Sequence, residues 1–185
     1  MSTGAQPPGS VRVQPATEAD LELIARLAAE IWRVCYAAIL APGQIDYMLA
    51  RMYSLDAMRE EMQGRGIRYD LLFEGGVAGG FASYGPESAP GLFKLHKIYL
   101  RPELQGRGLG SLLLRHCEAE ARRLGGRRLM LNVNKGNARA IAAYQRNGYK
   151  IAREVVADIG GGYVMDDFVM EKVLETQDSS MPTGQ

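Results

Sequence analysis

Hydrophobic and polar residues follow two different periods along this chain, and each stretch of one period predicts one kind of element. A helical period governs the first long stretch, which begins after Thr17 as N-cap, with Asp20 as part of a capping box, and runs to about Tyr36. Its apolar face consists of Leu21, Ile24, Leu27, Ala28, Ile31 and Cys35. Residues 11–15 and 92–100 instead alternate, as strands with one buried face do.

Applied to the whole chain, these periods predict the order β-α-α-α-β-β-β-α-β-α-β-β. Gly75-Gly76 is expected to turn a hairpin, and Pro42-Gly43 to separate the first two helices. The predicted strands are 11–15, 68–74, 77–84, 92–100, 128–133, 149–158 and 163–173, and the predicted helices are 17–36, 45–52, 55–63, 111–124 and 138–146. We therefore expect an α/β fold, with one mixed sheet of about seven strands flanked by four to five helices.

Length and charge narrow the possible functions. The 185 residues suffice for one domain, expected over 11–174, while residues 1–10 and 175–185 are too polar to bury a core and are expected to be disordered. The 22 lysines and arginines nearly balance the 21 aspartates and glutamates, so nucleic acid is not the expected partner. No run of about 18 apolar residues predicts a membrane span, and the first ten residues lack the apolar core of a signal peptide. We expect a cytoplasmic protein.

The two cysteines, Cys35 and Cys117, lie in apolar stretches with helical spacing. This placement favours buried free thiols over a disulfide or a reactive site. Two histidines and two cysteines without ligand spacing predict no metal site.

The most informative segment is a strand that leads through a glycine-rich turn into a helix. Gly106, Gly108 and Gly110 let the backbone approach a ligand closely, and the first N–H groups of the following helix favour an anion such as a diphosphate. A Walker A loop would need a lysine before Ser111, and a dinucleotide-binding loop would space its glycines as G-x-G-x-x-G. Neither motif fits, and an ordinary turn without a ligand remains the alternative.

A second informative segment is the helix predicted at residues 138–146. Asn137 suits its N-cap and Gly148 the position after its end. Asn137 and Tyr144 are separated by about two helical turns, so they share a face that could line a groove. The alternative is that Tyr144 is a half-buried core residue whose hydroxyl is satisfied.

Together the two segments resemble the GNAT acetyltransferases. Gln105-x-x-Gly108-x-Gly110 resembles the Q/R-x-x-G-x-G/A motif of this family, and the segment from Asn137 to Tyr149 resembles its N-x-x-A-x-x-x-Y-x-x-x-G-F/Y signature. The resemblance covers roughly residues 11–174 and implies a GNAT fold. Residues 32–62 and 158–167 are more loosely similar to bacterial members of the small-molecule, polyamine-type branch.

The resemblance implies acetyl-CoA as cosubstrate and a role for each motif residue. The pantetheine arm would pair with the strand ending in Ile98, Tyr99 and Leu100, and Asn137 would hydrogen-bond it. Tyr144 would protonate the leaving thiolate. The diphosphate would be held by Gln105, Gly106, Arg107, Gly108, Leu109, Gly110 and Ser111.

Acetylating an amine also requires a base, because an ammonium has no lone pair with which to attack a thioester. Alternation places Lys94, His96, Ile98 and Leu100 on one face of the strand at 92–100. Some amine acetyltransferases resemble this chain in having a Glu or His at that place, so His96 is the candidate base, directly or through a water. Several family members that acetylate protein N-termini have a Glu on the next strand, where this chain has Asn132.

The acceptor and the assembly are less determined. Trp32 and Tyr36 could form an aromatic wall for an alkyl amine, although such residues are more often core. The leading hypothesis is therefore acetylation of a small-molecule primary amine. The alternatives are acetylation of a protein N-terminus or lysine, and a non-catalytic acetyl-CoA-binding module. A homodimer is plausible because residues 149–173 would lie at a sheet edge.

Overall fold

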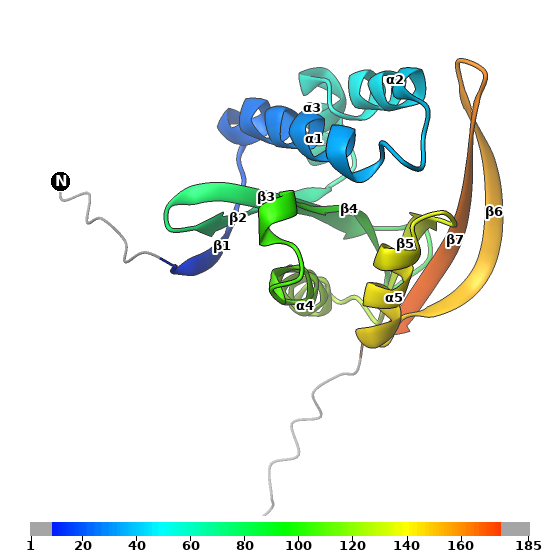
Figure 1. Ribbon diagram of the computed structural model, residues 1–185. Coiled ribbons are helices and arrows are strands. Elements are labelled where there is room, and N and C mark those ends of the chain that lie inside the picture. The colour runs from blue at the N-terminus through cyan, green and yellow to red at the C-terminus, as the bar shows by residue number, and fades with distance from the viewer. Residues whose placement is uncertain (1–8, 175–185) are drawn as a thin grey trace, which may run out of the picture.

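The helices and strands of the computed structural model, which describes residues 9–174, occur in the expected order (Figure 1). The strands are β1 (Val11–Pro15), β2 (Arg68–Glu74), β3 (Val77–Pro86), β4 (Leu92–Leu100), β5 (Arg128–Asn134), β6 (Lys150–Gly160) and β7 (Tyr163–Val173). The α-helices are α1 (Leu21–Cys35), α2 (Pro42–Met52), α3 (Leu55–Gln63), α4 (Leu109–Arg123) and α5 (Ala138–Arg146), with short 3-10 turns at Glu18–Asp20 and Pro102–Leu104. Of the ends expected to be disordered, residues 1–8 and 175–185 lie outside the described part.

Local signals account for most element boundaries. The backbone N–H and the hydroxyl of Thr17 both donate to the carboxylate of Asp20, at 2.8 and 2.9 Å, which confirms the capping box, although it caps the 3-10 turn before α1. Gly75 and Gly76 both adopt positive φ, as a tight hairpin turn requires. The helix predicted from residue 45 begins earlier, at Pro42, because a proline in the first helical turn loses no hydrogen bond.

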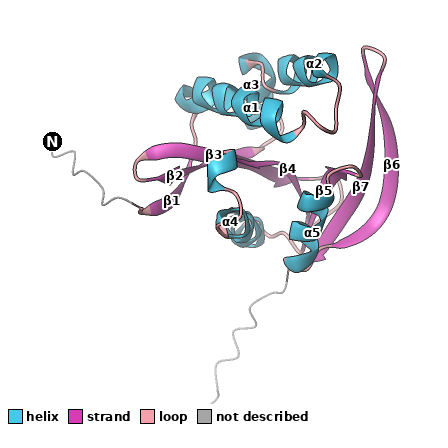
Figure 2. Ribbon diagram, in the orientation of Figure 1, coloured by secondary structure: helices cyan, strands magenta, loops and turns pink. Residues whose placement is uncertain are grey.

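The strands form a single mixed sheet in the order β1-β2-β3-β4-β5-β7-β6. Only β4 and β5 pair in parallel, and the other neighbours are antiparallel. Helices α1, α2 and α3 cover one face, and α4 and α5 cover the other (Figure 2). None of the helices within residues 9–174 is long and apolar enough to cross a membrane.

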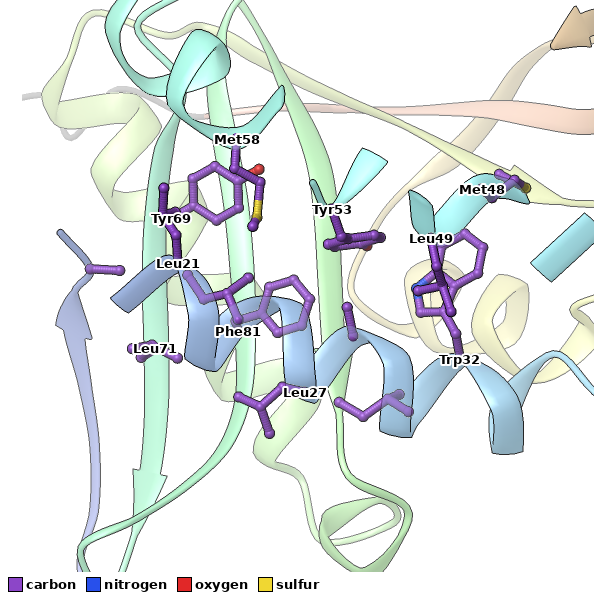
Figure 3. Packing of buried hydrophobic residues seen from close by; sticks show 14 of the residues in the cluster. Leu21, Leu27, Trp32, Met48, Leu49, Tyr53, Met58, Tyr69, Leu71 and Phe81 are labelled. Atoms are coloured by element: carbon purple, nitrogen blue, oxygen red, sulfur yellow. The ribbon is translucent and has the colours of Figure 1, made fainter. Parts of the chain in front are cut away.

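Each face of the sheet carries its own hydrophobic core. Figure 3 shows the first, in which Leu21 and Leu27 of α1 meet Tyr69, Leu71 and Phe81 of the sheet. In the second, the predicted stripe of α4 is buried at Leu113, Cys117 and Ala121, whereas Leu124 is half-buried. Both cysteines are free thiols, but only Cys117 is fully buried.

A β-bulge in β4 changes which side chains lie on each face of the sheet. The register against β3 shifts between Ser83 and Tyr84, so that Lys97 pairs with Ser83 and Leu95 with Tyr84, and His96 is the extra residue. The prediction that Lys94, His96, Ile98 and Leu100 share a face is therefore wrong. Before the bulge Phe93 and Leu95 pack on the α4 side, and after it Ile98 and Leu100 do so.

The same region separates β4 from β5. Their parallel pairing extends from Leu92 opposite Arg128 to Leu95 opposite Leu131, and no pairing follows it. At the far edge of the sheet, the β6–β7 hairpin contacts α2. The hydroxyl of Tyr47 donates to the carbonyl of Ile159 at 2.7 Å, and the amide of Gln44 donates to the carbonyl of Val164 at 3.1 Å.

Candidate active site

A groove of about 700 Å³ opens where β4 and β5 separate. Its walls come from the ends of these two strands, the N-terminal turn of α4, one face of α5 and the chain that follows α1. Figure 1 shows α4 and α5 below the sheet and α1 above it, so the groove passes between elements of both layers. Most of the predicted cofactor residues line it: Ile98, Tyr99, Leu100, Gln105, Gly106, Gly108, Gly110, Ser111 and Asn137.

The glycine turn presents free backbone donors at one end of the groove. Gly106 and Gly108 have φ of 78° and 79°, in the left-handed region that glycine adopts without strain. Within the described residues, the backbone N–H groups from Gly106 to Ser111 have no backbone acceptor. They lie at the N-terminus of the fifteen-residue helix α4, where the helix dipole adds positive potential. This end of the groove fits a diphosphate.

Two residues of the predicted phosphate site do not line the groove. The guanidinium of Arg107 forms an ion pair with Glu74 of β2, which raises the pKa of Arg107 through the hydrogen bond and the charge of that carboxylate. Leu109 is buried in the core between α4 and the sheet. Only their backbone N–H groups remain available to an anion.

Side-chain amides join the elements around the turn. The amide of Gln105 donates to the carbonyl of Leu100 at 3.0 Å and lies 3.2 Å from the sulfur of Cys35. The amide of Asn147, at the end of α5, donates to the hydroxyl of Ser111 at 2.9 Å. No role was predicted for Asn147, although it lies in the segment from Asn137 to Tyr149 that resembles the family signature.

Helix α5 brings Asn137 and Tyr144 to the same wall of the groove, as their spacing predicted. The side-chain oxygen of Asn137 accepts a hydrogen bond from the N–H of Ala140 at 3.1 Å, which leaves its amide hydrogens free. Tyr144 is half-buried, and no hydrogen bond contributes to the shift of its pKa. Burial raises that pKa, so the phenol is protonated at neutral pH and can donate a proton.

An aromatic cluster closes the opposite wall, but only part of it reaches the groove. Tyr36 and Tyr99 line the groove, with ring centroids 6.4 Å apart. Trp32, predicted to contact substrate, is 2% exposed and packs behind Tyr36 at 4.6 Å between centroids. Figure 3 shows Trp32 among the core residues, near Leu49 and Met48. The residue therefore supports Tyr36 rather than touching the groove.

His96 also lines the groove, at the bulge of β4. Burial, followed by the charges of Lys94, Lys97 and Arg65, lowers the pKa of its imidazole to about 3. Its Nε2 atom is buried without a hydrogen-bond partner among the described residues. The imidazole is therefore neutral at physiological pH, and it is a much weaker base than an ordinary histidine.

The bulge places a lysine in the groove that the alternating pattern had not indicated. Lys97 is 2% exposed, and its ammonium pairs with Glu61 of α3 and donates to the hydroxyl of Tyr69 at 2.8 Å. Burial lowers the pKa of Lys97, whereas Glu61 opposes that shift. A positive charge paired in this way anchors α3 to the strand beside the groove.

Comparison with known proteins agrees with this arrangement. The model of the acetyltransferase (GNAT) family matches residues 28–149. The chain is 28% identical to spermidine N(1)-acetyltransferase of Thermoplasma acidophilum over 171 residues, which cover 90% of this chain and 99% of that protein.

Solved structures show the same fold. The PaiA N-acetyltransferase of Thermoplasma acidophilum, in complex with coenzyme A, superposes with a TM-score of 0.74 at 24% identity, covering 89% of this chain and 99% of that one. The ribosomal-protein-S18-alanine N-acetyltransferase of Escherichia coli gives 0.69 at 20% identity, covering 93% and 99%. The family match over more than half of the chain, the seven-stranded sheet and the groove at its split lead to one conclusion: this chain belongs to the GNAT family and is an acetyl-CoA-dependent N-acetyltransferase.

Proposed function

We propose that the chain transfers the acetyl group of acetyl-CoA to a primary amine of a small molecule of the polyamine type, with Tyr144 as the general acid. The observation that carries the proposal is the position of Tyr144, a protonated phenol on the groove wall opposite the aromatic cluster. The likeness to a spermidine acetyltransferase over nearly the full length of both chains supports the acceptor class.

Each part of the groove has its own proposed role in binding acetyl-CoA or in catalysis. The free N–H groups at the start of α4 would hold the diphosphate of acetyl-CoA, and the amide hydrogens of Asn137 would bind its pantetheine arm. The end of β4, which pairs with β3 but no longer with β5, offers backbone groups to the same arm. The acetyl thioester supplies an electrophilic carbonyl carbon, and the phenol of Tyr144 would give its proton to the sulfur that leaves.

The acceptor must lose a proton before it attacks, because an alkylamine with a pKa near 10 is almost wholly protonated at pH 7. His96 as the base, directly or through a water, stays a prediction. With a pKa of about 3, its imidazolium would be roughly seven orders of magnitude more acidic than such an ammonium. Transfer to the imidazole is therefore strongly uphill, whether it is direct or passes through a water, because a bridging water does not change the proton affinity of His96. The cytoplasmic location and a homodimer through the sheet edge also stay predictions.

The test is acceptor-dependent release of the coenzyme A thiol, measured with spermidine, spermine, other amines, free amino acids and short peptides. We expect release with polyamines and a fall of about 10²- to 10⁴-fold in kcat for Tyr144→Phe, with unchanged acetyl-CoA affinity. Tyr149→Phe is the matched control, because that tyrosine is buried beside Tyr144, at 5.9 Å between centroids, and does not line the groove.

Three other results would contradict the proposal. Release with peptides alone would move the function to protein acetylation. Tight acetyl-CoA binding without release for any acceptor would favour a non-catalytic binding module. Equal activity of Tyr144→Phe and Tyr149→Phe would remove Tyr144 as the general acid.

A further inference from the structure

Strand β7 carries a buried carboxylate that none of the roles above uses. Asp167 is 8% exposed, and its Oδ1 atom has no hydrogen-bond partner among the described residues. Within residues 9–174, no lysine, arginine or histidine nitrogen lies within 4 Å of it. Folded proteins rarely bury a carboxylate without compensation, because its desolvation costs several kcal/mol. A residue kept in this state is a candidate for binding a cation that arrives with a ligand.

Asp167 does not itself line the groove, but it lies directly behind residues that do. Asp167 pairs with Asn134 across the β5–β7 ladder and lies on the same face of β7 as Met165, which packs against the core under α1 and α2. The groove residue Asn132 is two positions earlier on β5, and its amide stabilises the ionised form of Asp167. Tyr36 also lines the groove, and the charge of Asp167 contributes to its raised pKa after burial.

The neighbouring charges compensate this carboxylate only in part, and none of them forms an ion pair with it within residues 9–174. Lys135 is bound to Glu154 at 2.7 Å and to Asp166 at 2.6 Å. The charges of Lys94 and Lys135 lower the pKa of Asp167, whereas the charge of Asp166 raises it. Burial is the main cause that raises the pKa of Asp167. Asp167 is therefore a stronger proton acceptor than an ordinary aspartate, whereas His96 is a weaker one than an ordinary histidine.

We propose that Asp167 binds the ammonium group of the acceptor and accepts its proton before the attack on acetyl-CoA. The inference rests on the proposed amine acetylation and adds a recognition element for a cationic acceptor, with Tyr36 as the adjoining aromatic wall.

The protons balance along this route. The ammonium gives one proton to Asp167, and the amine forms the N–C bond as the C–S bond breaks. Tyr144 protonates the thiolate and recovers a proton from the acetylated nitrogen through water. Asp167 releases its proton to solvent, so the net products are the amide, the coenzyme A thiol and one proton.

The test compares Asp167→Asn with Asp166→Asn, its exposed neighbour on the other face of the strand. Each variant is assayed with spermidine between pH 6 and 10, alongside its acetyl-CoA affinity and melting temperature. We expect Asp167→Asn to lower kcat/KM at pH 7 by about 10²-fold or more. The deficit should shrink about tenfold per pH unit towards the pKa of the amine, because a variant without the base must use the free amine. Acetyl-CoA affinity should not change, and the melting temperature should hold or rise. Asp166→Asn removes a nearby charge but leaves the carboxylate of Asp167 in place, so it should lose far less activity than Asp167→Asn.

Asp167→Glu, which keeps a carboxylate, should retain more activity than Asp167→Asn. A wild-type rate and pH profile in Asp167→Asn would overturn this inference alone. So would a deficit that stays constant with pH and accompanies a lower melting temperature, because that pattern marks a structural role. If the wild type releases no thiol with any amine, the proposed function fails and this inference fails with it.

Discussion

Gly108 begins α4 in the left-handed region, and replacing it with alanine tests whether the turn acts by aiming backbone N–H groups. Its φ is 79° and ψ is −6°, and a Cβ built there would meet no atom within 4 Å. Gly108→Ala therefore introduces backbone strain without a steric clash. Gly162, in the β6–β7 turn, has φ of 78° and the same open surroundings, so Gly162→Ala is a matched control.

The expected loss of stability is small and equal at the two sites. An L-residue in the left-handed region costs about 1–2 kcal/mol. Alanine also restricts the unfolded chain, which returns roughly 0.4–1 kcal/mol. The net loss of about 1 kcal/mol corresponds to a melting temperature about 2–4 °C lower for a domain of this size. The free energy of unfolding alone therefore does not separate the two variants.

Acetyl-CoA affinity should separate them. Relaxation of the strained backbone at residue 108 turns the free N–H groups of the turn away from the anion, whereas relaxation at residue 162 changes a distant hairpin. We expect calorimetric titration to show acetyl-CoA binding weakened about tenfold or more in Gly108→Ala and unchanged in Gly162→Ala, since each charge-assisted hydrogen bond contributes about 1.5–3 kcal/mol. Gly108→Asn should be milder because asparagine tolerates the left-handed region. Equal affinities in the two alanine variants would refute the reasoning.

Three further predictions concern stability, measured by urea unfolding. The hydrogen bond to Asp70 raises the pKa of His116 in the folded state. The stability that this bond contributes is therefore complete below the pKa of the unfolded chain, near 6.5, and is lost as the pH rises through the folded-state pKa. His116→Gln should lower the free energy of unfolding more at pH 5.5 than at pH 8.5. The pH dependence expected for His96 is the reverse, because its lowered pKa costs about 2 kcal/mol of stability at pH 5. His96→Asn should therefore gain stability relative to the wild type in acid. Equal pH dependence in the two variants would contradict both assignments. Glu61→Gln leaves the buried ammonium of Lys97 without its counter-charge and should lower the free energy of unfolding by about 3 kcal/mol. The double variant Lys97→Met with Glu61→Leu should recover most of that loss. A Glu61→Gln variant as stable as the wild type would contradict a buried pair.

Features that depend on local chemistry were predictable from the sequence. The order of elements follows from apolar periodicity and turn residues, and Gly75-Gly76 turns the hairpin because both residues reach positive φ. The glycine turn and the spacing of Asn137 and Tyr144 located the groove because they describe backbone shape and one helix face.

What failed depends on partners distant in the sequence. The direction of His96 changes because β3 imposes a bulge on β4, and alternation within β4 contains no information about that register. Arg107 turns to Glu74 on another strand, and Trp32 is covered by Tyr36. Asp167 had no motif to mark it, since its environment is created by β5 and the end of α1.

The short pairing of β4 with β5 has a mechanical consequence. Four residue pairs, Leu92–Leu95 against Arg128–Leu131, join the two halves of the sheet by main-chain hydrogen bonds. Acetyl-CoA bound in the groove, as proposed above, would hold the two halves of the sheet together at this junction. A ligand at a hundred times its Kd stabilises the bound form by about 2.7 kcal/mol. Amide exchange in these paired strands, and the lifetime of the enzyme against proteases, should therefore depend on the acetyl-CoA concentration. The supply of acetyl-CoA would then determine how long the enzyme persists as well as how fast it works.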